Sequence, residues 1–271
     1  MPVINTNVNA LFAQTALRVN NRSLSSAMEQ LSSGSRINSA KDDAAGIAIS
    51  STMTAQIRGL GQAVRNANDG VNMLQTAEGA MIEQTNMLQR MRELAVQSST
   101  ASYSTTQQGY LDKEYQALST QIESISDQTQ WNGTTILQGT GGDGSGKYVF
   151  TVGASATETV DVTIPDMQGL IAGDVTSSGT ATAAVALIDT ALGKVNSARA
   201  TIGAGINRLT YAADNLNNVI QNTTASRSQI VDTDYATATT QLARAQIIQQ
   251  AATAMLAQAN QSPQSVLALL K

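Results

Sequence analysis

The sequence predicts a mainly α protein, a long antiparallel helical rod or coiled-coil bundle with one small β-hairpin region. Three observations lead to this fold class. The 271 residues contain proline only at Pro2, Pro165 and Pro263, which leaves long uninterrupted tracts for helices. Apolar residues recur along these tracts at heptad spacing, which is typical of helices that pack lengthwise. Aromatic residues make up only 3%, so the core must consist of small and aliphatic side chains, which suit close helix packing.

Residues 1–35 are predicted to form the first helix. Its seam has apolar residues seven positions apart, with Met28 between the last two: Val3, Ala10, Leu17, Leu24 and Leu31. The run Ser32-Ser33-Gly34-Ser35 interrupts this pattern. Asp42 and Asp43 then offer N-cap oxygens for a new helix.

Residues 36–138 are predicted to contain two further helices. The first, from about Asp43 to Ser98, carries two adjacent apolar columns, which implies packing against at least two neighbours. The columns are Met73, Ala80, Met87 and Leu94, and Leu74, Met81, Leu88 and Ala95. The second helix carries the series Leu111, Tyr115, Leu118, Ile122 and Ile125. The turn sequence Asn132-Gly133 ends it, and Trp131 is expected to cover the end of the bundle.

Residues 139–179 change in character to Gly, Ser, Thr and Asp. Two segments alternate with period two, Lys147–Val152 and Glu158–Ile164, and Pro165 follows the second. They predict a β-hairpin insert, which is too small to have a core of its own.

Residues 180–222 are predicted to form a return helix, 223–235 a connector with a break near residues 232–234, and 236–271 a last helix that Pro263 interrupts. The seam of the return helix is Ile188, Leu192, Val195, Ile202, Ile206, Leu209, Leu216 and Ile220. The seam of the last helix is Ala238, Leu242, Ala245, Ile248, Ala252, Met255 and Ala259. This order of elements requires the two ends of the chain to return to the same side.

Charge is distributed unevenly along the chain. All 20 Asp and Glu lie within residues 29–234, and the charged residues outside that range are Arg18, Arg22, Arg244 and Lys271. A solvated helix face normally carries Lys and Glu. Amphipathic helices whose outer face has only amides and hydroxyls are therefore expected to be covered by other protein. The two ends of the chain are predicted to be buried in an assembly.

Composition argues against several classes of function. The chain has no cysteine and no histidine, which removes disulfides, thiol nucleophiles, and the commonest general base and metal ligand. We therefore expect no enzyme activity, no cofactor and no metal. The net charge of −4 argues against nucleic-acid binding. No stretch approaches the roughly 20 apolar residues of a membrane span, and the N-terminus lacks the pattern of a secretory signal peptide.

Two motifs with catalytic potential have simpler structural interpretations. The run Gly141–Lys147 matches the first seven positions of a phosphate-binding loop. However, Tyr148 stands where Ser or Thr would hold magnesium, and a strand follows instead of a helix. A flexible glycine turn is the preferred interpretation. The aspartate pairs at 42–43 and at 232/234 lie at helix breaks, where they are expected to act as N-caps.

Several long motifs closely resemble bacterial flagellin, in the same order and over nearly the whole chain outside residues 139–179. In the first half they are Ile4–Asn7, Leu31–Gly46, Arg65–Gly70 and Leu88–Gln97. In the second half they are Ser226–Ala236, Leu256–Gln261 and the terminus Val266–Lys271. The resemblance implies a structural subunit that polymerises into the bacterial flagellar filament for swimming motility.

In the flagellin family the terminal helices pair as a coiled coil in the inner layer of the filament, and the long central helices and hairpin surround it. The resemblance therefore assigns residues 1–35 and 236–271 to the inner layer, and 36–138 and 180–222 to the outer helical layer. With only a hairpin between its halves, the chain resembles a minimal flagellin without outer domains. The polymerisation interface is expected to include Leu17, Leu24, Leu31, Leu242, Ile248, Met255, Leu267 and Leu270.

The resemblance also implies partners and a location. Flagellins leave the cell unfolded through the flagellar type III apparatus, and an export chaperone first holds the C-terminal segment. They join the extracellular filament under its cap, in contact with hook-associated proteins, and self-association is the main interaction. Mammalian Toll-like receptor 5 recognises a flagellin surface whose residues match Gln89, Arg90, Leu94 and Glu114 here. The last three are expected to lie on one convex face.

Three alternatives remain at this point. A hook–filament junction protein shares the terminal architecture but is expected in few copies per filament. A phosphate-binding-loop nucleotide hydrolase is disfavoured by Tyr148 and by the following strand. A free-standing coiled-coil binding module would form a discrete oligomer rather than a growing polymer.

Overall fold

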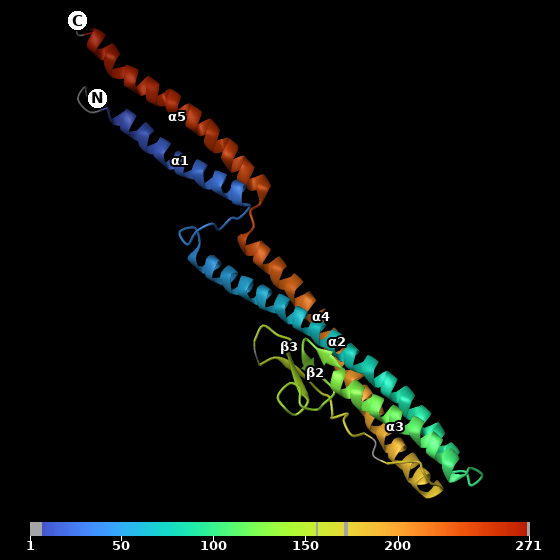
Figure 1. The fold of residues 1–271 in the computed structure, drawn as a ribbon. Helices are drawn as coiled ribbons and strands as arrows, with labels where there is room; N and C mark the ends of the chain where they lie inside the picture. Colours follow the sequence, from blue (N-terminus) through green and yellow to red (C-terminus); the bar gives the residue numbers. More distant parts are fainter. Residues whose placement is uncertain (1–6, 156, 171–172, 270–271) are drawn as a thin grey trace. The chain divides into compact units, whose positions relative to one another are not determined.

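The computed structural model describes residues 7–155, 157–170 and 173–269, with side chains up to residue 261. These residues form five helices: α1 (Val8–Ser33), α2 (Ala44–Ser98), α3 (Thr105–Gln128), α4 (Ser178–Val231) and α5 (Tyr235–Leu269). Figure 1 shows the elements in chain order. The predicted mainly α fold class is confirmed. The chain divides into two compact units, which are described separately: a terminal unit of residues 1–55 and 222–271, and a central unit of residues 56–221.

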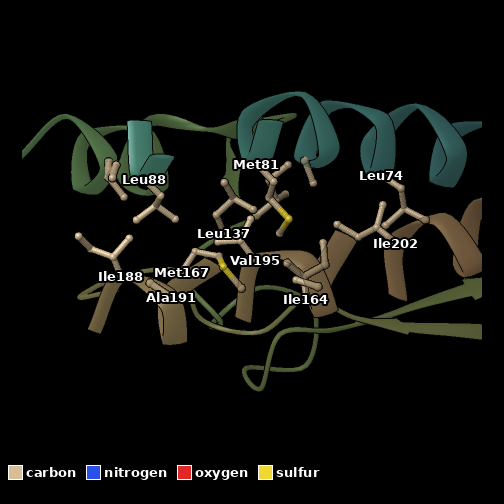
Figure 2. Close-up of a cluster of buried hydrophobic side chains, with 14 of the residues drawn as sticks. Leu74, Met81, Leu88, Leu137, Ile164, Met167, Ile188, Ala191, Val195 and Ile202 are labelled. Carbon is tan, nitrogen blue, oxygen red and sulfur yellow. The ribbon is translucent and has the colours of Figure 1, made fainter. Parts of the chain in front are cut away.

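The core of the central unit is built by the predicted columns of α2 and α4. In Figure 2, Leu74, Met81 and Leu88 of α2 face residues of α4 that include Ile202, Val195 and Ile188. All of these side chains are fully buried. Glycine and alanine fill the narrow contacts between the helices: Ala67, Ala77, Ala181, Ala184, Ala191, Ala198 and Gly205 are buried. The low aromatic content therefore corresponds to a core of interlocking aliphatic and small side chains.

A column of buried polar side chains, which the sequence patterns did not reveal, joins α2 to α3 and to the chain that follows. The Gln84 Nε2 donates to Ser126 Oγ at 2.8 Å, and Ser126 Oγ lies 2.9 Å from the Met167 carbonyl oxygen. The Ser98 Oγ donates to the Val175 carbonyl oxygen at 2.6 Å. Because buried polar groups need partners, these bonds fix the non-helical segment between the hairpin and α4.

The predicted hairpin is present as β3 (Lys147–Thr151) paired antiparallel with β4 (Thr159–Thr163). Its inner residues, including Val160 and Val162, are buried in the same core as the helices. The hairpin approaches the helices closely, because a Cβ on Gly205 would lie only 2.6 Å from the Val162 Cγ2. A Cβ on Gly70 would lie 2.8 Å from the Phe150 ring. The insert therefore shares the core of α2 and α4.

A second, shorter hairpin was not predicted. It pairs β1 (Gln130–Trp131) with β2 (Thr134–Thr135). The turn between them is the Asn132-Gly133 pair, with φ values of 49° and 79°, and this turn was predicted. Strands of two residues are too short to show alternation. Trp131 is half-buried and packs against the main core.

One predicted helix end and one predicted interruption are wrong. The helix α4 continues through Val231, so most of the expected connector 223–235 is helical and the break is confined to residues 232–234. The polar residues at 223–228 are compatible with a helix because their hydroxyl groups can donate to carbonyl oxygens of the same helix. The Ser226 Oγ, for example, donates to the Asn222 carbonyl oxygen at 2.9 Å. The helix α5 also continues past Pro263, so the expected interruption there is wrong.

Replacing Gly205 by alanine is expected to destabilise the central unit. The added methyl group would press on the stiff, buried Val162, and such overpacking costs roughly 1–3 kcal/mol of unfolding free energy. A methyl group on Gly203 would meet no atom within 4 Å beyond its own helix backbone, so Gly203→Ala should raise stability by up to about 1 kcal/mol. Thermal or urea unfolding measures both. Equal changes in unfolding free energy in the two variants would contradict the close approach of the hairpin to α4 at Gly205.

Candidate assembly surface

The terminal unit is an antiparallel pair of helices, α1 and α5. The two lie side by side in Figure 1, and their ends toward the chain termini lie together. The Asn20 Nδ2 donates to the Ala245 carbonyl oxygen at 2.8 Å, and Asn7 Nδ2 donates to the Ala259 carbonyl oxygen at 2.8 Å. Gln249 Nε2 reaches the side-chain oxygen of Asn21 at 3.3 Å. From Asn7 to Asn20 along α1 the partner changes from Ala259 to Ala245 along α5, which defines the antiparallel pairing.

The contact seam follows alternating spacings of three and four on both helices. Its α1 members are Ala10, Ala13, Leu17, Asn20, Leu24, Ala27 and Leu31, and its α5 members are Ala238, Leu242, Ala245, Gln249, Ala252, Leu256 and Ala259. All are buried or half-buried. The predicted coiled-coil seam is thus present, but seven of these 14 residues are alanine, so the pair alone buries little apolar area.

The predicted seam was wrong at three positions. Met28, Ile248 and Met255 are exposed by 55%, 42% and 65%. The polar residues Asn20 and Gln249 occupy seam positions instead, and Leu256 replaces its neighbour Met255. The sequence prediction chose the most hydrophobic residues and so stepped three positions from Ala245 to Ile248. In the structure the seam steps four positions from Ala245, which places Gln249 in it instead. Asparagine within an apolar seam is a known feature of coiled coils, but it cannot be identified from hydrophobicity.

The residues expected at the polymerisation interface therefore lie in different places. Leu17, Leu24, Leu31 and Leu242 are half-buried in the seam between α1 and α5. Ile248 and Met255 point outward from the pair. The Leu267 side chain, Leu270 and the seam residue Val3 lie outside the residues that the structure describes. The seam leucines bind α1 to α5, and the exposed residues are the ones available to another molecule.

An apolar groove runs along one flank of the helical pair. It is lined by Asn9, Phe12, Ala13, Ala16, Ile248, Ala251, Ala252, Met255, Gln258 and Ala259. Phe12 at its edge is 72% exposed, and nearby Leu11 and Ile247 are 62% and 67% exposed. Sequence reasoning missed Phe12, although it is one of only two phenylalanines and occupies an outer position of the heptad. Large exposed apolar side chains on neighbouring turns are typical of a protein–protein contact.

Charge is scarce around this groove. The charged residues of α1 and α5 are Arg18, Arg22, Glu29 and Arg244, and all four are exposed. Within the described residues, every ion pair lies in the central unit. Little charge would need to be desolvated if the pair were covered by another protein.

The base of the helical pair is held by a short backbone clasp, formed by residues 34–36 and 229–233. Ser35 and Asp232 form an antiparallel β-bridge. The Thr233 N–H donates to the Gly34 carbonyl oxygen at 2.9 Å, and Arg36 N–H donates to the Val231 carbonyl oxygen at 2.6 Å. The Arg36 guanidinium donates to the Ile230 carbonyl oxygen at 2.6 Å, so a cation covers the free carbonyls at the end of α4.

One aspartate of each predicted pair caps a helix beside the clasp, whereas Asp42 accepts from Ser39 and Asp232 accepts from the Ser228 hydroxyl. The Asp43 Oδ1 accepts from the Ala45 and Gly46 N–H groups at the start of α2. Asp234 accepts from the Ala236 N–H and from the Thr237 hydroxyl, and the Thr237 hydrogen bond is the main reason its pKa is lowered. Hydrogen bonding to Ser39 likewise lowers the pKa of Asp42. Among the described residues, no group of three acidic side chains is placed to hold a metal ion.

The residues that resemble a receptor-binding surface lie in the central unit. The Arg90 guanidinium pairs with Glu114 of α3 at 2.9 Å and with Glu93 at 3.0 Å, and hydrogen bonding to Glu114 raises the pKa of Arg90. Gln89 is exposed beside this pair. Leu94 is only 1% exposed, because it belongs to a core column of α2, so the expectation that it shares a convex outer face with Arg90 is wrong.

The glycine run before β3 is a turn, as predicted. Gly142, Gly144 and Gly146 adopt φ values of 72°, 89° and 73°, and the Lys147 ammonium pairs with Asp161 on the opposite strand at 2.9 Å. A phosphate-binding loop needs a free lysine and a following helix, and neither is present here. None of the helices, over the residues described, combines the length and apolar character that a membrane crossing requires.

Comparison with known proteins gives consistent matches over the whole chain. The family models described as the bacterial flagellin N-terminal and C-terminal helical regions match residues 4–141 and 185–270. A flagellin of Halalkalibacterium halodurans is 44% identical over 99% of this chain and 100% of its own length. Flagellin A of Vibrio anguillarum is 35% identical over 99% of each chain. The crystal structure of Bacillus cereus flagellin, 30% identical, superposes with a TM-score of 0.52 over 56% of this chain and 88% of that one.

Trypsin is expected to cut the unpolymerised protein first near Arg36 and Arg227, within the terminal unit. Half of the α1–α5 seam positions are alanine, so the seam offsets little of the entropy of ordering two helices, whereas the central unit has a large buried core. Mass spectrometry of the digest should show a resistant fragment that begins after residue 36 and ends near residue 227. Early cleavage inside the central unit, with α1 and α5 intact, would contradict this order.

Proposed function

The chain belongs to the bacterial flagellin family, and from this premise we propose how its terminal helices build the filament. It is a structural subunit of the flagellar filament. Its length matches the minimal type, because the flagellin of Halalkalibacterium halodurans aligns over 275 positions. The alignment with Flagellin A of Vibrio anguillarum extends over 375 positions, which exceeds the 271 residues of this chain. The extra positions belong to the longer relative.

The apolar groove on the α1–α5 pair is the proposed subunit–subunit contact. The observation that supports it is the exposure of Phe12, Ile248 and Met255 on helices that carry almost no charge. A soluble protein rarely leaves such a surface uncovered. In a helical homopolymer the occupant is a different face of the terminal helices of a second copy, because a surface that paired with itself would close a two-fold dimer. Leu17, Leu24, Leu31 and Leu242 contribute indirectly, because they hold the two sides of the groove together.

Of the alternatives left open by the sequence, the polymer-forming subunit has the strongest support. Full-length similarity to flagellins favours it over a junction protein, which would be rare in sheared filaments. A free-standing coiled-coil module would not need the exposed groove beside an already formed seam. Members of the flagellin family are structural proteins, in keeping with the absence of histidine and cysteine.

We further propose the partners and location that such a subunit requires. The chain would be exported through the flagellar type III apparatus and reside in the extracellular filament, in contact with the cap and hook-associated proteins. Before export, a chaperone would cover the C-terminal segment. Support comes from α5, whose outer face carries Ile247, Ile248 and Met255 and a single charge at Arg244. Nucleic acid and membrane are not among the proposed partners.

Recognition by Toll-like receptor 5 is proposed for the exposed patch made by Gln89, Arg90 and Glu114. Arginine in a patch that joins two helices is typical of interface hot spots. The ion pair to Glu114 holds the Arg90 guanidinium in place on the surface. Leu94 would support this patch from the core without contact to the receptor.

Ile248→Glu is expected to prevent filament growth without unfolding the central unit. The change would bury an unpaired carboxylate in each subunit contact, at a cost of several kcal/mol. Ser155→Glu at the exposed tip of the β3–β4 hairpin is the matched control and should assemble normally. Seeded polymerisation followed by electron microscopy and motility in a complemented strain measure the effect. Normal filaments from Ile248→Glu would show that the groove is not a subunit contact.

Arg90→Ala is expected to weaken Toll-like receptor 5 signalling by the soluble protein at least tenfold, while its thermal stability changes little. The ion pairs of Arg90 are exposed, and such pairs contribute about 0–1 kcal/mol to stability. Arg65→Ala, an exposed arginine earlier on α2, is the control. A reporter-cell assay with purified protein measures both. Unchanged signalling by Arg90→Ala would remove this patch from the receptor site and leave the filament assignment intact.

A further inference from the structure

The residues of the seam between α1 and α5 are compatible with two registers, which differ by a shift of one helix along the other. In the observed register Asn20 is paired with Ala245. Counting antiparallel from this pair gives the neighbouring pairs Leu24 with Leu242, Leu17 with Gln249, Ala13 with Ala252, and Ala27 with Ala238. Alanine recurs at every seventh position of α5, from Ala238 to Ala259, and leucine recurs in the same way on α1. Such repetition weakens the specification of register.

A shift of α1 by one heptad toward the C-terminus of α5 keeps the character of the seam. It would create the pairs Leu17 with Leu256, Leu31 with Leu242, Leu24 with Gln249, Ala13 with Ala259, and Ala27 with Ala245. Leucine again meets leucine, and alanine again meets alanine. Asn20 would reach the Ala252 carbonyl oxygen, an acceptor equivalent to the one it has, and Gln249 would remain within one turn of Asn20. Neither apolar packing nor the buried amide separates the two registers.

The lengths of the elements also permit the shift. The helix α5 has 35 residues and α1 has 26, a difference of 35 − 26 = 9, which exceeds one heptad. One heptad corresponds to roughly 10.5 Å along a helix. The ten residues 34–43 that connect α1 to α2 can span up to about 33 Å when extended, so the connection can lengthen by that distance.

We propose that the clasp at residues 34–36 and 229–233 sets the register of the helical pair, with Arg36 as its main positioning residue. The clasp is the contact that a heptad shift would break, because both of its backbone hydrogen bonds join the α1–α2 connection to the α4–α5 break. The Arg36 guanidinium adds hydrogen bonds to the Gln229 and Ile230 carbonyl oxygens. Gln30 Nε2 in turn donates to the Arg36 carbonyl oxygen at 3.2 Å.

The register determines which assembly surface the protein presents. In the observed register Phe12, Ile248 and Met255 line the groove together. After the shift, Phe12 would lie one heptad further along α5, beside Met255 and without Ile248, and Val19 would take the place of Phe12, so the groove would have a different lining. This consequence rests on the proposed role of the groove in the filament, whereas the register itself can be measured independently of assembly.

Disulfide trapping in the full chain tests the proposal. The protein has no cysteine, so introduced thiols are the only ones. The pair Ala27→Cys with Ala238→Cys reports the observed register, and Ala27→Cys with Ala245→Cys reports the shifted one. These three alanines are buried in the seam. Both pairs are oxidised in soluble and in polymerised protein, and products of monomer mass on a denaturing gel are intrachain cross-links.

With the clasp intact, the first pair should cross-link and the second should not. Arg36→Ala combined with Thr233→Pro, which removes the N–H donor to Gly34, should raise the ratio of the second product to the first at least tenfold. Arg22→Ala and Thr233→Ala are the matched controls, since they keep the clasp donors, and they should leave the ratio unchanged. An unchanged ratio in the clasp variant would overturn the proposal, and so would the absence of both cross-links from polymerised protein with an intact clasp.

The same experiment separates this proposal from the assembly surface. A changed ratio together with normal filaments from Ile248→Glu would support the clasp and contradict the groove as the subunit contact. Lost assembly of the clasp variant with an unchanged ratio would contradict the clasp and leave the groove in place.

Discussion

Close approach between helices, allowed by glycine and alanine at their contacts, is the constraint on which the rest of this structure depends. With aromatic residues at 3% of the chain, a core can be filled only if backbones come near enough for aliphatic side chains to interlock. In the central unit that approach leaves room for the β3–β4 hairpin over Gly70 and Gly205. In the terminal unit it gives an alanine-rich seam, which holds two helices together without burying the larger apolar side chains. The exposed groove is a direct consequence of that seam.

The two units use electrostatics differently. The central unit has exposed ion pairs that join its helices, as between Arg92 of α2 and Asp189 of α4, where the guanidinium lowers the pKa of the carboxyl group. The helices of the terminal unit carry little charge and place amides in their seam. Charge suits a surface in water, and neutral polar groups suit a surface that other protein will cover. The uneven distribution of acidic residues in the sequence follows this division of roles.

Much of the fold could be predicted from the sequence, because heptad spacing and helix breaks have direct physical causes. The α2 and α4 columns, the aspartate caps and the β3–β4 hairpin all followed from such patterns. The details that failed depend on three-dimensional packing. Hydrophobicity assigned Ile248 and Met255 to the seam, whereas geometry placed Gln249 and Leu256 there. The resemblance that suggested Leu94 as a surface residue carried no information on burial. The polar column at Gln84 and Ser126 cannot be distinguished in sequence from a solvated strip.

The alanine-rich seam has a consequence for the growing end of the polymer. A helical pair that buries so little area gains most of its order from neighbours, so folding of α1 and α5 and addition of the next subunit are one coupled equilibrium. Subunits inside the filament have neighbours on all sides, while the last few have neighbours on one side only. The terminal helices are therefore least stable at the tip of the polymer. Growth should show a critical concentration below which the newest subunits unfold at α1 and α5 and dissociate. A subunit of this design favours elongation of an existing filament over the start of a new one.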